Sequence, residues 1–191
     1  MADYGSKKFV PVYTFGNNNI TLNAITEEFV YPVSSTSDDL FNTYYKDIDD
    51  SYAKDIIIRL AQYGIYFEDT NFKPDEAISE KDFISMIYSA KRGNGEAINE
   101  ETYEKAYEYA QNAGIIQPED KSQGDNTITR QKASIYIIRM LGMEDVAKLN
   151  IYSPQFNDVT ENIGYSAILS GFGIMSGDGN GKFNPQIGRA H

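Results

Sequence analysis

Apolar residues recur at helical spacing in several stretches of the chain, and polar, glycine-containing loops separate these stretches. Such spacing predicts amphipathic helices, each of which buries one face. The expected buried positions of the first four helices are Ile56, Ile57, Leu60 and Tyr63; Phe83, Ile84, Ile87 and Tyr88; Tyr103, Ala106, Tyr107 and Ala110; and Ala133, Ile137, Met140 and Leu141. A fifth, shorter helix is expected at about residues 161–172. The pattern therefore predicts a mainly α fold.

The predicted helices follow a repeated outline, and such a repeat defines the unit of the fold. A Gly-Ile pair closes one helix, a polar loop follows, and an Ile-Ser or Ile-Thr pair opens the next helix. The distance from the closing glycine to the opening isoleucine is 14 residues both from Gly64 to Ile78 and from Gly114 to Ile128. A third copy begins at Gly173. We therefore expect tandem helix-loop-helix repeats.

Residues 1–33 have a different composition, rich in β-branched and aromatic residues, with a Gly-Asn-Asn-Asn turn signal at residues 16–19. They predict a short β segment of two or three strands. Two interpretations of this segment stay open, the tail of a preceding domain or strands that pack on the repeats. The polar residues 34–40 then predict a linker.

The motifs at the ends of these repeats resemble those of the S-layer homology (SLH) domain, a bacterial cell-surface module that usually occurs in threes. The family pattern is Phe-x-Asp, a helix, Gly-Ile, a Gly-rich loop ending in Phe-x-Pro, and Ile-Thr-Arg opening a second helix. The matching residues are Tyr45-Lys46-Asp47-Ile48, Phe72-Lys73-Pro74, Ile128-Thr129-Arg130, Phe156-Asn157-Asp158-Val159 and the loop that ends in Phe183-Asn184-Pro185. The resemblance implies repeats at 41–93, 94–150 and 151–191 around a pseudo-threefold helical bundle.

The third repeat is expected to be incomplete, because no second helix follows its Phe-x-Pro element. Residues 187–191 have two interpretations, a native ending or a foreign tail on a truncated fragment. No apolar export segment follows Met1. The resemblance, which implies an exported protein, therefore implies that this sequence is a piece of a longer chain.

The net charge of −11 argues against nucleic acid and anionic membrane surfaces as partners, because both need basic patches. The chain has no cysteine, and it has no apolar run long enough to predict membrane insertion. The same acidity opposes binding of an anionic polymer over the whole surface. Any such binding must therefore depend on local cationic or amide pockets.

Arg130 is the main candidate binding residue. It lies in the first turn of a predicted helix, where a cation opposes the helix dipole but backbone amides can hold an anion. Its guanidinium can bind a carboxylate in a forked, charge-assisted contact. The alternative is an exposed arginine paired with an acid such as Asp125. Glu80 takes the matching place in the first repeat, suits the helix start and predicts a structural role there.

The resemblance adds Thr129, Asp47, Tyr52, Gly114 and Asp158 to the candidate glycan-binding residues. Asp47 and Asp158 match the early Asp of the family, and capping or turn formation is the alternative to a sugar contact. Tyr52 takes a position where the family often has Trp, with core packing as the alternative to stacking on a sugar. Closure of a helix is sufficient to explain Gly114.

No enzymatic site is expected, since the sequence lacks a Ser-His or Cys-His constellation and a phosphate loop. No cofactor or metal is expected either, because the Asp178 loop has arginine where an EF-hand needs its twelfth-position Glu. The resemblance implies an extracellular module that anchors a surface protein to the cell wall by binding anionic secondary cell-wall polysaccharide. The alternative is a structural spacer or self-association module of a surface layer.

Overall fold

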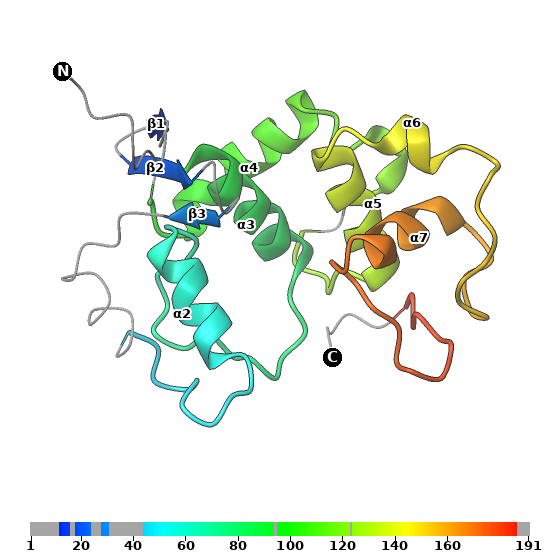
Figure 1. The fold of residues 1–191 in the computed structure, drawn as a ribbon. Helices are drawn as coiled ribbons and strands as arrows, with labels where there is room; N and C mark the ends of the chain where they lie inside the picture. The colour runs from blue at the N-terminus through cyan, green and yellow to red at the C-terminus, as the bar shows by residue number, and fades with distance from the viewer. Residues whose placement is uncertain are drawn as a thin grey trace, which may run out of the picture. The chain divides into compact units, whose positions relative to one another are not determined.

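The computed structural model describes residues 12–15, 18–23, 28–30, 44–93, 95–122 and 124–186 of this protein, and it confirms a mainly α fold (Figure 1). The predicted linker and the ending at 187–191 lie outside the described residues. The helices are α2 Lys54–Gln62, α3 Glu80–Arg92, α4 Glu100–Asn112, the 3-10 turn η1 Pro118–Asp120, α5 Arg130–Met140, α6 Glu144–Ala147 and α7 Ile163–Gly171.

The chain divides into two compact units, each described by itself. Met1–Pro74 and Ser89–Asn99 form the first unit, and Asp75–Tyr88 and Glu100–His191 form the second. The expected β segment lies in the first unit as an antiparallel sheet in the order β1-β2-β3. Its strands are β1 Val12–Phe15, β2 Asn18–Asn23 and β3 Glu28–Val30.

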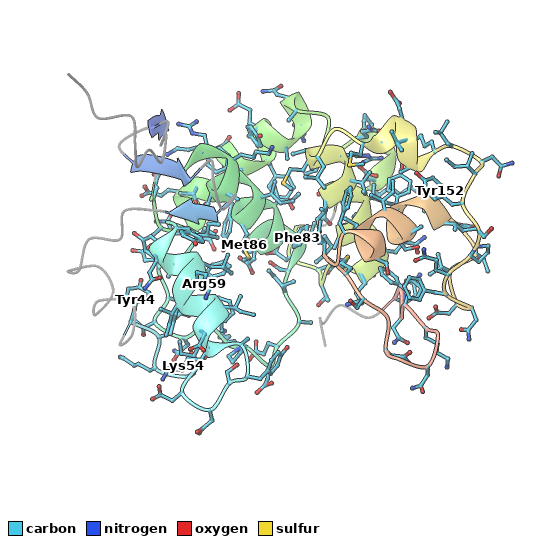
Figure 2. All side chains as sticks on the ribbon, viewed as in Figure 1. Tyr44, Lys54, Arg59, Phe83, Met86 and Tyr152 are labelled. Carbon is cyan, nitrogen blue, oxygen red and sulfur yellow. The ribbon has the colours of Figure 1, made fainter. Side chains whose placement is uncertain are left out.

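The helix of the first unit, α2, buries a face that is rotated from the predicted one. Ile57 and Ile58 pack with Tyr45 and Ile48 in the core of this unit, whereas 61% of Ile56 is exposed. The prediction that Ile56 is buried was therefore wrong. Three consecutive isoleucines fit either of two neighbouring stripes, and packing against Tyr45 and Ile48 selects the second. Figure 2 shows the side chains around α2.

Glycines close the first helix of each repeat, as the repeated outline predicts. Gly64, Gly114 and Gly173 have positive φ values of 80°, 68° and 69°. The amide after each glycine returns to a carbonyl five residues earlier, in the pairs Ile65–Leu60, Ile115–Ala110 and Ile174–Leu169. These shared bonds, together with the left-handed glycine that they require, show that the three helix ends are structurally equivalent.

The core of the second unit contains residues from α3, α4 and α5. Ile84, Ala106 and Tyr136 are fully buried in it. A second cluster joins α5 to α6 and α7 through Ile138, Ala147 and Leu169. Leu141 was predicted to be buried in this region, but 41% of it is exposed, because α5 ends at Met140 and Leu141 follows the helix.

A buried ion-pair network positions α6, a helix that the apolar pattern did not predict. Arg139 Nε donates to Glu144 Oε1 at 2.8 Å, and Arg139 Nη1 donates to Asp120 in η1. Lys148 Nζ lies 3.1 Å from the same Glu144 oxygen, and the Tyr165 hydroxyl of α7 donates to it at 3.1 Å. Glu144 therefore connects α5, α6 and α7.

We expect Glu144 to contribute to stability in a pH-dependent way. Burial by itself raises its pKa, but the hydrogen bonds from Arg139 and Lys148 outweigh burial and lower the pKa from 4.5 to about 2. A lowered folded-state pKa stabilises the protein above pH 4.5, and that contribution is lost as the pH falls toward 2. Glu144→Gln should therefore cost about 2–3 kcal/mol at pH 7 and much less near pH 3. Urea unfolding of both proteins at the two pH values measures this; a pH-independent difference would contradict it.

A substitution at Ser85 is expected to raise the free energy of unfolding rather than lower it. Its hydroxyl is fully buried and has no hydrogen-bond partner among the described residues. Ser85→Ala removes this unsatisfied group from α3 and should raise the free energy of unfolding by about 1 kcal/mol.

Ser134 in α5 is the matched control. It is also buried, but its hydroxyl donates to the Arg130 carbonyl at 2.7 Å. Ser134→Ala should leave stability unchanged or lower it by up to about 1 kcal/mol. Thermal unfolding separates the two effects, and equal losses from both substitutions would show that Ser85 is not an unsatisfied group.

Candidate functional site

The candidate site is built on the start of α5. Thr129 is the N-cap residue, and its Oγ1 accepts a hydrogen bond from the Lys132 amide at 3.2 Å. Thr129 therefore satisfies one of the amides of the first turn of α5. The first helical residue is then Arg130, which the cap holds at the end of the helix where the backbone amides converge.

Arg130 binds the loop of the third repeat. Its Nε donates to the Phe183 carbonyl at 2.9 Å, and its Nη2 donates to the Ser176 carbonyl at 2.7 Å. The guanidinium carbon also lies 4.7 Å from the centroid of the Phe183 ring, which is a cation–π distance. The next amide, that of Gln131, donates to the Pro185 carbonyl at 3.0 Å. The loop carbonyls therefore already occupy part of the hydrogen-bonding capacity of Arg130 and the helix-start amides, which we expected a ligand to use.

Asp158 fixes the same loop from its other side. Its Oδ1 accepts from the Phe183 amide and its Oδ2 from the Asn184 amide, both at 2.8 Å. Asp158 thus holds the amide of Phe183 while Arg130 holds the carbonyl of the same residue. Of the alternatives left open for Asp158, the structure shows turn formation.

Asp47 makes the equivalent turn in the first repeat. Its two carboxylate oxygens accept from the Phe72 amide at 2.8 Å and the Lys73 amide at 2.7 Å. Lys73 and Asn184, the residues before the two prolines, share a left-handed φ of 57°. In each of the two repeats, the carboxylate of one aspartate therefore stabilises the same strained turn.

The charge of Arg130 is not neutralised by a direct ion pair within the part of the chain that the structure describes. Asp125, the acid suggested by the sequence, pairs instead with Lys81 at 2.9 Å. Burial lowers the pKa of Arg130, and the nearby charge of Asp158 raises it. A half-buried cation bound only to neutral carbonyls still attracts an anion, so this arrangement can accept an acidic group.

The other predicted site residues do not all belong to the unit that contains Arg130. Tyr52, of which 76% is exposed, and Asp47 lie in the first unit. The exposure of Tyr52 rules out the core-packing alternative. Gly114 ends α4 and accepts a hydrogen bond from Gln117 rather than from this cluster. The structure thus brings together Thr129, Arg130 and Asp158.

The sequence did not indicate the residues that complete this cluster. Phe183 and Ser176 contribute backbone carbonyls to Arg130, and a backbone carbonyl carries no residue-type signal. The Phe-x-Pro motif was the one available indication for Phe183.

Among the described residues, no helix has the length and apolar character needed to cross a membrane.

Comparison with known proteins supports the repeated outline. The family model of the S-layer homology domain matches residues 44–84 and 155–186. The exoglucanase XynX of Acetivibrio thermocellus is 29% identical over 158 residues, which cover 74% of this chain. The match covers only 14% of the length of that exoglucanase. No solved structure matches the chain significantly.

Each of the two matched segments contains one of the two turns that Asp47 and Asp158 stabilise. S-layer homology domains are non-catalytic binding modules that attach proteins to the cell wall. On the family match, the repeated helix ends and the equivalent turns, residues 44–84 and 155–186 of this chain are similar to the S-layer homology domain.

Proposed function

We propose that this chain anchors a surface protein to the bacterial cell wall by binding acidic groups of secondary cell-wall polysaccharide, with Arg130 as the main contact. The observation that carries this proposal is the half-buried guanidinium, which hydrogen-bonds to two neutral carbonyls. The carbonyls orient the side chain without neutralising it. A carboxylate on a sugar would supply the missing charge.

Tyr52 is proposed as a second contact. Its exposed ring can stack on the apolar face of a sugar as a separate contact in the first unit. Asp47 and Asp158 are proposed to act mainly by shaping their turns. Their carboxylates retain lone pairs that can accept a sugar hydroxyl.

The runner-up is a structural spacer or a self-association module. It is favoured by the use of Arg130 to hold the loop of the third repeat. It is also favoured by exposed apolar side chains in the second unit, including Ile151, of which 71% is exposed, and Phe172, of which 59% is exposed. On this alternative, loss of Arg130 would change stability or assembly and leave binding to walls unchanged.

Arg130→Gln tests the proposal. Replacing the guanidinium with a neutral amide should weaken binding to purified sacculi by about tenfold or more, since a charge-assisted hydrogen bond is worth about 1.5–3 kcal/mol. Arg130→Lys keeps the charge but loses the fork and should bind with intermediate affinity. Co-sedimentation with sacculi, before and after acid extraction of their non-peptidoglycan polymer, measures the binding.

Arg59→Gln is the control, because it makes the same charge change at an exposed residue of α2 (Figure 2). It should bind sacculi like the unaltered chain. All variants are compared at a temperature at which circular dichroism shows each to be folded. Unchanged binding by a folded Arg130→Gln protein would favour the spacer, and binding that survives extraction of the polymer would exclude the polysaccharide as the ligand.

A further inference from the structure

Glu80 presents a buried carboxylate at the start of α3. Only 2% of the residue is exposed, although it is the first residue of the helix. Its Oε1 accepts from the hydroxyls of Tyr136 and Ser122, both at 2.8 Å, and its Oε2 accepts from Lys132 Nζ at 3.0 Å. A buried charge is tolerated only when it is paired and hydrogen-bonded in this way.

The three donors form a cradle that matches a carboxylate rather than a general polar group. It provides one ammonium and two hydroxyls, distributed over both oxygens. Burial, followed by the hydrogen bond to Glu80, raises the pKa of Tyr136, so its hydroxyl stays a donor at neutral pH. Lys132 and Tyr136 both come from α5. The cradle is therefore built by the second repeat, and the carboxylate comes from the first.

The backbone around Glu80 is also satisfied by the second repeat. The Glu80 amide donates to the Asn126 carbonyl and the Lys81 amide donates to the Gly124 carbonyl, each at 2.9 Å. The Lys81–Gly124 bond corresponds to the Gln131–Pro185 bond at the start of α5. Each helix start thus donates an amide to a loop carbonyl, and the two first residues are opposite in charge.

From this geometry we infer that Lys132, Tyr136 and Ser122 form a second carboxylate-binding site, whose occupant is Glu80 of the same chain. The ammonium group of Lys132 is paired with Glu80 and is therefore not available to an external acid. This junction is therefore closed, while the Arg130 junction stays open. The contrast between closed and open junctions rests on the proposed function; the carboxylate site itself does not.

Removal of Glu80 should convert the cradle into a site for a free carboxylate. Glu80→Ala deletes a CH2–COO⁻ group, and acetate has nearly the same size, shape and charge. The melting temperature of Glu80→Ala should fall below that of the unaltered chain. At constant ionic strength and pH 7, replacing about 100 mM chloride with acetate should then raise it by about 3–5 °C.

Three proteins serve as controls for the acetate effect. The unaltered chain and Glu80→Gln keep the cradle filled, so acetate and chloride should act on each of them equally. Glu80→Ala/Lys132→Met lacks the ammonium and should lose the acetate-specific rise. An equal response of Glu80→Ala to the two anions would overturn the inference.

A second measurement applies if Glu80→Ala does not fold. Glu80→Gln and Lys132→Met each break the pair while keeping its volume, and the double variant should lose less melting temperature than the sum of the single losses. Additive losses would overturn the inference. Neither measurement contains polysaccharide, so a failure here is distinct from a failure of Arg130→Gln to affect wall binding.

Discussion

The start of each second helix depends on carbonyls from the loop of the following repeat. The first amides of an α-helix have no acceptor inside the helix and must find one elsewhere. At α3 the acceptors are the carbonyls of Gly124 and Asn126, and at α5 the acceptor is that of Pro185. This requirement brings each loop to the first residue of a helix. The side chain of that first residue then faces the neighbouring repeat.

The identity of this one residue decides what the junction can do. Glu80 brings a negative charge and is neutralised by Lys132 and two hydroxyls. Arg130 brings a positive charge and meets two carbonyls, which orient it but leave its charge. The same backbone arrangement thus gives a self-occupied junction in one case and a cationic surface in the other. A family match alone would not distinguish the two.

The sequence predicted the parts of the fold that depend on local rules. The glycine ends, the helix start at the Ile128-Thr129 pair and the mainly α class follow from φ preference, the residue types that open helices and helical period. The buried face of α2 was misassigned, because isoleucine at 56, 57 and 58 leaves the period ambiguous. The short helix α6 is positioned by the hydrogen bonds of Glu144 with Arg139 and Tyr165. The spacing of apolar residues does not predict such polar contacts.

The candidate site was predicted only in part for a related reason. Arg130, Thr129 and Asp158 could be found from their motifs. The partners of Arg130 are backbone carbonyls far along the chain, and Lys132 and Glu80 are separated by 52 residues. Neither relation has a signature in residue type or spacing. The sequence did not decide whether Tyr52 is buried or exposed, because an aromatic residue at helical spacing fits both environments.

The acidity of the chain is compatible with the proposed anion capture at Arg130 because the two effects act over different distances. At physiological ionic strength, charges separated by more than about 8 Å are largely screened. The net charge of −11 therefore repels a polymer mainly at long range, where salt weakens it. The guanidinium acts at contact, in a half-buried position where screening is weaker. Repulsion then slows encounter, while the local contact determines how long a bound acidic group remains.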